Sequence, residues 1–255
     1  MIERSEERVP WTLQQTLFGT VLTLVPWVAF VLGVDVLNAK APPINTVLTP
    51  QQDVIDAIIQ FFFSSLIEAA FLIAPIYIAL YAYRFVKPRL LPALRTLGFR
   101  KFPVGRSLLW VVVLMLVILG VNILYQYLIT ALRLNLQTND QILLQNSKYM
   151  PIATYATLVV ASTVAPLCEE VFFRGLIFTG FQQAMPLPLA ILFSAILFGM
   201  AHLDPASFPI LFVIGLALAF LRWRTNSLWP CILLHLVNNT FGAVLIIFAM
   251  NGITK

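Results

Sequence analysis

The sequence predicts an all-α, polytopic membrane protein, a transmembrane helical bundle of about seven spans. Of its 255 residues, 60% are hydrophobic and only 11% are charged, whereas soluble domains are about 45–50% apolar and about 25% charged. Seven apolar stretches approach the length of about 20 residues that crosses a bilayer as a helix. These proportions exclude an ordinary soluble domain, a disordered chain and a nucleic-acid-binding module, so nucleic acid is not expected as a partner.

The first three predicted spans fill the N-terminal half of the chain. They cover residues 12–37, 54–83 and 108–132. Each is expected to be helical, because a backbone in lipid must satisfy its own hydrogen bonds. The first span is too long for the core of a signal peptide, so we expect it to be retained.

A basic loop between the second and third spans predicts the orientation. Seven of the sixteen basic residues lie within residues 84–106, with no acidic residue among them. Such loops remain in the cytoplasm, which places the N-terminus in the cytoplasm as well. Seven spans then leave the C-terminus outside. The plasma membrane of a prokaryote is the expected location.

Four further spans are expected in the C-terminal half. They cover residues 152–181, 187–203, 209–221 and 228–250. The connections leave no room for a soluble domain, so the chain forms one integral membrane domain. Straight spans would place Glu169 and His202 at different depths. A span that continues past Pro166 to about Phe181 would place Glu169 near mid-depth. We therefore expect a broken, tilted or partly re-entrant helix there, with Pro166, Pro186 and Pro188 as candidate break points.

Few ionisable side chains lie inside these apolar stretches, and such residues are functional by default because burying them in a bilayer is costly. They are Glu68, Glu169, Glu170, Arg174, His202 and His235. On a helix, Glu170 and Arg174 are four positions apart and can pair, whereas Glu169 lies about 100° away. Glu169 is then a free carboxylate, which is the profile of a general base. The alternative is an ion-paired group that only holds helices together.

The chain has two histidines, and each shares a helix face with a second side chain. Phe198 and His202 are four positions apart, as are His235 and Asn239, while Asn238 is expected to point elsewhere. An intramembrane histidine on its own often forms a helix–helix hydrogen bond. Together with a free carboxylate, these residues could supply a base, a water-holding group and oxyanion donors for hydrolysis. They could also supply a zinc set of two His and one Glu.

Three motifs in order carry a family resemblance. They are EEVFFR at 169–174, FGMAH at 198–202 and HLVNN at 235–239. They resemble those of the CPBP family, the CAAX-processing and bacteriocin-processing (Abi) intramembrane proteases. This family is often named metalloprotease and is related to type II CAAX prenyl endopeptidases. The resemblance covers about residues 150–250 and implies a catalytic transmembrane core there, with a polar catalytic cavity. Residues 1–149 supply N-terminal transmembrane helices and the basic cytoplasmic loop.

The resemblance also implies a role for four individual residues. Glu169 would activate the attacking water, and His202 would help to hold that water. His235 and Asn239 would bind the developing oxyanion.

Other residues of the motifs would support this site. Glu170 and Arg174 would form the supporting pair, and Phe198 would lie at the cavity. Glu68 is outside the motifs, and we expect it either to line the cavity or to form a hydrogen bond within the bundle. The cofactor stays open between none and a divalent metal such as zinc. The ligands of such a metal would be Glu169, His202 and His235.

We therefore expect an intramembrane endopeptidase. Its substrate would be a membrane-associated or lipidated peptide or protein in the bilayer, in a reaction like that of CAAX prenyl proteases or in bacteriocin or peptide processing. One alternative is a non-catalytic membrane scaffold or immunity protein that binds a partner through the same cavity. Another is a proton-coupled transporter, which would show a repeat with matching broken helices in both halves. The sequence shows no such repeat.

Overall fold

A computed structural model describes residues 9–40 and 46–252, and every regular element within these residues is a helix. Six helical segments of the described chain are long and apolar enough to cross a membrane. A seventh apolar helix, α9 (Leu187–Ala201), is shorter, and its 15 residues rise about 22 Å. The predicted all-α bundle of about seven spans is confirmed, and the chain is an integral membrane protein.

The N-terminal half contributes three spans and a short connecting helix. The first span is α1 (Leu13–Lys40). The second is continuous over Pro50–Ala82 and consists of α2 (Pro50–Ala69), the short η1 (Ala70–Leu72) and α3 (Ile73–Ala82). Helix α4 (Leu90–Leu97) lies within the basic loop, and α5 (Val104–Ala131) is the third span.

Gly98 ends α4 in a left-handed conformation, with φ of +117°, which a residue with a Cβ rarely adopts. The carbonyl of Gly98 accepts a hydrogen bond of 2.8 Å from the Leu228 backbone amide. This bond fixes the basic loop on the start of the last helix.

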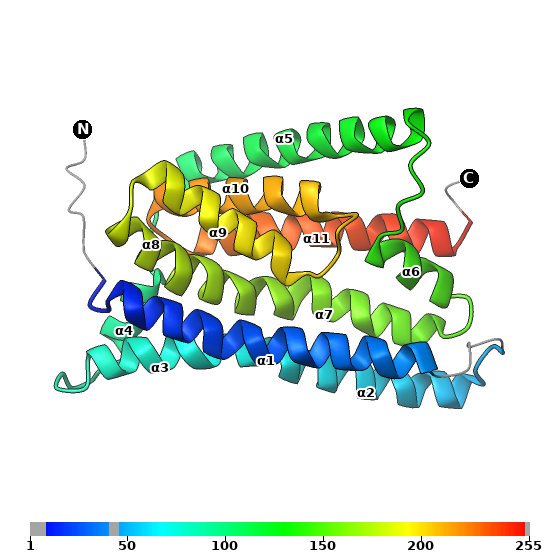
Figure 1. Ribbon diagram of the computed structural model, residues 1–255, viewed down its shortest axis with the longest axis horizontal. Helices are drawn as coiled ribbons and strands as arrows, with labels where there is room; N and C mark the ends of the chain where they lie inside the picture. Colours follow the sequence, from blue (N-terminus) through cyan, green and yellow to red (C-terminus); the bar gives the residue numbers. More distant parts are fainter. Residues whose placement is uncertain (1–8, 41–45, 253–255) are drawn as a thin grey trace.

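The C-terminal half begins with α6 (Asn139–Asn146), which is too short to cross a membrane. The next span is continuous over Pro151–Ala184 and consists of α7 (Pro151–Glu170), the π-helical η2 (Val171–Ile177) and α8 (Phe178–Ala184). Helices α9, α10 (Phe208–Thr225) and α11 (Trp229–Met250) follow. The start of α1 and the end of α11 lie at opposite ends of the bundle, in agreement with seven passages (Figure 1).

The predicted break at Pro166 is wrong. Pro166 is buried inside α7, and the helix continues through it. A proline removes one helical hydrogen bond, but packing on neighbouring helices can hold such a helix together. The departure from α-geometry comes five residues later, in η2. Pro186 and Pro188 do mark a break between helices, since Pro186 is the N-cap of α9 and Pro188 lies in its first turn.

The length of this span removes the depth conflict between Glu169 and His202. Glu169 precedes Ala184 by 15 positions, and His202 follows Leu187 by 15 positions. The two residues are therefore equally far from the turn that joins α8 to α9. They reach the same level of the bundle without a re-entrant segment.

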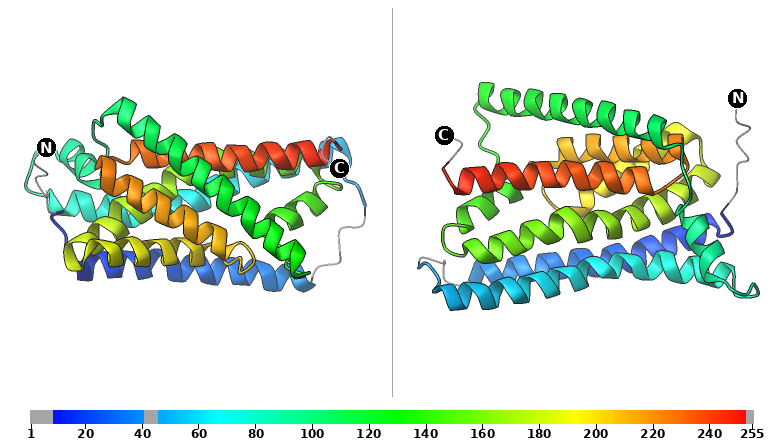
Figure 2. Two further views of the ribbon diagram at one scale, coloured as in Figure 1. Left: turned by 90° about the horizontal axis from the view of Figure 1, so that it is seen from above. Right: turned by 180° about the vertical axis from the view of Figure 1, so that it is seen from behind.

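The α7–η2–α8 span is the centre of the molecule. Helices α1, α2 and α3 cover one side of it, and α10, α11 and α5 lie on the other side (Figures 1 and 2). All seven residues of η2 are buried. The largest fully buried apolar side chains include Phe172, Phe173, Phe178 and Phe198. The core is therefore aromatic and is concentrated immediately after the EE pair.

Candidate active site

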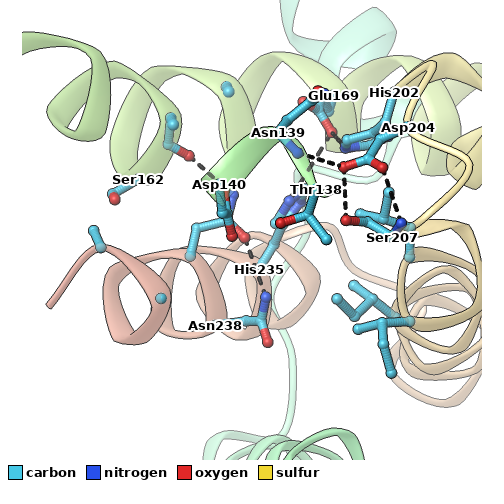
Figure 3. A pocket seen from close by; sticks show the side chains of 18 of the residues that line it. Thr138, Asn139, Asp140, Ser162, Glu169, His202, Asp204, Ser207, His235 and Asn238 are labelled. Carbon is cyan, nitrogen blue, oxygen red and sulfur yellow. Dashed lines mark hydrogen bonds and ion pairs between the residues drawn. The ribbon is translucent and has the colours of Figure 1, made fainter. Parts of the chain in front are cut away.

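A cavity of about 520 Å³ opens within the bundle, and its wall comes from both halves of the chain. Helix α7 contributes Glu169, the end of α9 contributes Phe198 and His202, and α11 contributes His235 (Figure 3). These side chains come from three separate spans. The structure thus brings together the residues that the three sequence motifs single out.

Both histidines direct Nε2 at Glu169. The distance from Glu169 Oε2 is 4.0 Å to His202 Nε2 and 4.0 Å to His235 Nε2. Oε2 is buried and accepts no hydrogen bond from any described residue. A spacing of 4.0 Å is longer than a direct hydrogen bond. The Glu169 carboxylate therefore lies close to two imidazoles without forming a hydrogen bond to either.

Glu170 has a different position from its neighbour. Its Oε1 lies 2.8 Å from Arg174 Nη1, and both side chains are fully buried. The predicted i, i+4 ion pair is therefore present. The same oxygen lies 2.9 Å from His235 Nδ1, a contact between two spans that the sequence did not predict. Arg174 also donates to the carbonyl of Gly215 on α10 at 3.3 Å.

The contacts at the two Nδ1 atoms assign the histidine tautomers. His202 Nδ1 lies 2.8 Å from the Phe198 carbonyl, and His235 Nδ1 faces the Glu170 carboxylate. A carbonyl and an ionised carboxylate only accept hydrogen bonds, so each Nδ1 carries the hydrogen. In a neutral imidazole, Nε2 is then an acceptor, and both Nε2 atoms face Glu169.

Phe198 packs against both histidines. Its ring centroid lies 4.8 Å from that of His202 and 5.6 Å from that of His235, both edge to face. The guanidinium of Arg174 lies 4.4 Å from the same ring centroid. Phe198 is 1% exposed, so its buried ring packs against both imidazoles and restricts the orientation of their planes.

Asn239 lines the cavity, but its amide already has partners. Its Nδ2 donates to the Ala161 carbonyl at 2.9 Å, and its Oδ1 accepts from Asn238 Nδ2 at 3.2 Å. Asn238 lines the cavity as well, so the expectation that it points elsewhere is wrong. Helical spacing separates adjacent side chains by about 100°, and a cavity this wide covers both directions.

Glu68 reaches the cavity from α2, which was one of its two predicted positions. It lies close enough to Glu169 for the two carboxylates to repel each other. Its Oε2 is buried and has no hydrogen-bond partner among the described residues. The cavity therefore contains two carboxylates with unsatisfied oxygens.

Polar groups that the sequence pattern does not single out lie at the cavity mouth. Asp204, in the turn between α9 and α10, accepts hydrogen bonds from the Asn139 amide (2.9 Å), the Ser207 amide (3.0 Å) and the Ser207 hydroxyl (2.6 Å) (Figure 3). The bond from Asn139 fastens the start of α6 to the α9–α10 turn, and the two bonds from Ser207 hold the carboxylate within that turn. In the sequence, the feature that points to these groups is an acidic residue, Asp204, two positions after His202. It lies outside the apolar stretches in which ionisable residues indicate a site.

Two carboxylates near this mouth have displaced pKa values. Burial on its own raises the pKa of Asp204, but the hydrogen bonds from Asn139 and Ser207 outweigh it and leave the pKa below its usual value. Partial burial raises the pKa of Asp140, and the charge of Asp204 raises it further. Asp140 is thus a carboxylate whose ionised form lacks stabilisation by a nearby cation.

The residues considered as zinc ligands are spaced more widely than the ligands of one zinc ion. Within the described part of the chain, no three His, Cys, Asp or Glu side chains are grouped closely enough to hold a metal ion. Two ligands of one tetrahedral zinc ion are about 3.4 Å apart, whereas Glu169 Oε2 is 4.0 Å from each Nε2. As they stand, the donors do not fit a metal.

Comparison with known proteins finds relatives of the C-terminal part of the chain. Residues 151–241 match the family model described as "Type II CAAX prenyl endopeptidase Rce1-like". The chain is 32% identical over 107 residues to "Putative membrane peptidase YdiL" of Bacillus subtilis, which covers 42% of each protein. It is 34% identical over 142 residues to an "Uncharacterized protein" of Mycoplasma capricolum, covering 51% of this chain and 40% of that protein.

The matches have a defined extent. The chain spans only about two fifths of the length of these two relatives, and no solved structure matches it. The family model includes all three motifs, EEVFFR, FGMAH and HLVNN, in one continuous segment. The similarity of this chain to the type II CAAX prenyl endopeptidase family is therefore confined to residues 151–241.

Proposed function

We propose that this chain is an intramembrane endopeptidase that hydrolyses a peptide bond with a water molecule activated by Glu169. The observation that supports this most directly is the pair of 4.0 Å distances from Glu169 Oε2 to the Nε2 atoms of His202 and His235. At this spacing a water molecule can donate one hydrogen bond to the Glu169 carboxylate and the other to the acceptor Nε2 of His202. The substrate would be a membrane-associated or lipidated peptide or protein.

In the first step, Glu169 accepts a proton from the water as its oxygen attacks the scissile carbonyl carbon. The new C–O bond forms, and the negative charge moves to the former carbonyl oxygen. The neutral imidazole of His202 accepts a hydrogen bond at Nε2 from the second hydrogen of the water. This bond orients the lone pair of the water oxygen toward the carbonyl carbon. In the second step, Glu169 returns the proton to the amide nitrogen, and the C–N bond breaks.

The developing oxyanion needs hydrogen-bond donors. A neutral His235 cannot supply one from Nε2, because its hydrogen is on Nδ1, facing Glu170. A doubly protonated His235 donates from both nitrogens. Asn239 retains one amide hydrogen beyond the one that it gives to Ala161. We therefore assign the oxyanion to His235 in its cationic form together with Asn239.

Glu170 and Arg174 act through His235 rather than on the substrate. Glu170 receives the Nδ1 hydrogen of His235 and thereby orients the ring. Arg174 neutralises Glu170 in a site from which water is excluded. Neither residue would exchange protons with the substrate.

The proposal is tested by incubating the purified protein in proteoliposomes with a peptide library that includes lipidated members. New termini are identified by mass spectrometry for the wild type, for Glu169→Gln and for Asp56→Asn. Asp56 is the matched control, because it lies on α2 and does not line the cavity. Termini made by the wild type and Asp56→Asn, but not by Glu169→Gln, would support the proposal.

A parallel incubation with a chelator decides the metal question. Termini that appear equally with and without the chelator would assign the reaction to Glu169 and water alone. Termini that vanish would assign a metal to the same residues. If the three proteins give identical products under all conditions, the endopeptidase proposal is refuted, and a non-catalytic scaffold that binds a partner becomes the better explanation.

A further inference from the structure

The cavity is acidic, although the chain as a whole is basic. The charged residues on its wall, within the described residues, are Glu68, Asp140, Glu169 and Asp204, and neither Lys nor Arg contributes. The whole chain carries a net charge of +5. A cleft lined by one sign of charge, with low-dielectric walls, concentrates ions of the opposite sign. The cavity is therefore suited to a cation.

These four carboxylates are not equivalent. Asp204 accepts three hydrogen bonds, one from the start of α6 and two from Ser207 within its own turn, so its function is structural. Glu169 is assigned to the water, and Glu68 lies close to it. Asp140 remains, in the first turn of α6, and no described residue forms a hydrogen bond or ion pair with its carboxylate. It faces only the repulsion of Asp204.

A second group in the cavity also lacks a partner. The Ser162 side chain is 6% exposed, and its hydroxyl has no hydrogen bond within the described chain. Ser162 lies seven positions before Glu169 and therefore on the same face of α7, and it lines the same cavity (Figure 3). A buried hydroxyl without a partner is costly, and the backbone of a bound peptide would satisfy it.

We infer that the cavity recognises a peptide with a basic side chain, in which a lysine or arginine lies against Asp140 while the peptide backbone meets Ser162. This inference names the substrate class of the proposed endopeptidase and rests on that function. A cation beside Asp140 offsets the repulsion between the Asp140 and Asp204 carboxylates. It also gives Asp140 an ionic partner, which the described residues do not provide. Asp140 is thus a specificity-determining residue.

The test measures binding separately from turnover. The probes are N-acetylated, palmitoylated Ala/Ser/Leu peptides with a fluorescent label, whose central residues are all Lys, all Gln or all Glu. Binding is measured by fluorescence anisotropy to the Glu169→Gln protein in nanodiscs of zwitterionic lipid, so that neither cleavage nor bilayer charge contributes. We expect the Lys peptide to bind about fivefold tighter than the Gln peptide, which is the range of an exposed ion pair, and the Glu peptide to bind more weakly.

Variants at Asp140 attribute this preference to one residue. Asp140→Asn should remove the advantage of the Lys peptide and leave the affinity for the Gln peptide unchanged. Asp140→Lys should reverse the order, so that the Glu peptide binds best. Asp56→Asn makes the same charge change on α2, outside the cavity, and should leave the Lys preference intact. Ser162→Ala should weaken the three peptides equally.

Each outcome separates the two proposals. Equal affinities for the three peptides, or an identical loss in Asp140→Asn and Asp56→Asn, would overturn the basic-substrate inference, whatever the cleavage assay shows. A Lys preference that depends on Asp140 supports the inference even if the wild type cleaves nothing. In that case the endopeptidase proposal alone fails, and the cavity is a binding site for basic peptides.

Discussion

At the residue scale, two adjacent glutamates have opposite environments. Glu170 is fully buried and contacts both Arg174 and His235, whereas Glu169 retains an oxygen without a partner in the described structure. The difference arises because consecutive helical side chains diverge by about 100°. One carboxylate is turned into the helix packing and the other into the cavity. Substitution of the two residues should therefore have different consequences.

Glu169→Gln is expected to lower the rate of peptide hydrolysis by about a hundredfold or more, because the amide cannot accept a proton from water. The fold should be kept, since Glu169 forms no ion pair closer than 4.0 Å. Initial rates and the melting temperature of the same preparation test both statements. A variant that cleaves as fast as the wild type would refute the assignment of the base.

Glu170→Ala is expected to destabilise the fold by about 3–5 kcal/mol, because Arg174 is left buried without its counter-ion. Thermal unfolding in detergent measures this loss. Replacing both members of the pair, Glu170→Met with Arg174→Met, is the control, and it should recover much of the stability since no charge remains buried. An unchanged melting temperature in the single variant would show that the pair does not support the fold.

At the element scale, close helix crossings bring the motif-bearing spans together. Gly215 of α10 lies directly on α9, where a Cβ would come within 2.9 Å of Ala195 Cα and 3.1 Å of its carbonyl oxygen. The same residue accepts the hydrogen bond from Arg174. The approach of α9 and α10 therefore depends on the missing side chain, and it also positions the turn that follows His202.

Gly215→Ala is expected to destabilise the protein by about 1–3 kcal/mol, because the backbone of α9 must move to admit a methyl group. Gly120→Ala on α5 is the matched control. A Cβ there meets no described atom within 4 Å, so the change should be neutral or stabilise the helix by about 0.5–1 kcal/mol. Equal melting temperatures for the two variants would contradict the close crossing.

The attachment of α6 should depend on pH through Asp204. Its folded-state pKa lies below the usual value of 3.8, so its contribution to stability is complete above that pH. The contribution is lost as the pH falls through the lowered pKa. Asp204→Asn should have this effect at neutral pH, with faster hydrogen exchange in residues 139–146. Unchanged exchange in this variant would show that α6 is held by other contacts.

At the scale of the whole molecule, six helical segments of the described chain are long enough to cross a membrane, and the basic loop lies at the end where α1 begins (Figure 1). We propose that this end is cytoplasmic, because basic loops remain inside. The mouth formed by α6 and the α9–α10 turn would then face outward. Substrates would enter the cavity from the outer side of the membrane.

This orientation can be tested with single cysteines, since the native Cys168 and Cys231 are both buried. Gln137→Cys, next to α6, should react with a membrane-impermeant maleimide in intact cells. Lys101→Cys, in the basic loop, should react only after permeabilisation. Both positions are exposed in the fold, so accessibility alone cannot separate them. The reverse pattern of labelling would refute the proposed orientation.

The sequence by itself determined the local features of this protein. The spans follow from apolar length, and the Glu170–Arg174 pair follows from helical spacing, since both depend on residues close together in the chain. The similarity of residues 151–241 to the CAAX-protease family rests on three motifs that are each local. Whether a helix continues through a proline depends on the helices that pack against it. The expected break at Pro166 was wrong because this packing overrides the local effect of the proline.

Only the tertiary structure decided which distant groups meet. The contact between Glu170 and His235, the bonds of Asp204 to α6 and the position of Asn238 in the cavity join segments separated by up to 65 residues or depend on the width of the cavity. No local periodicity encodes such contacts, because they arise from the angles and offsets at which whole helices pack. The acidic wall of the cavity is likewise a property of the assembled bundle, and it is invisible in a chain whose net charge is +5.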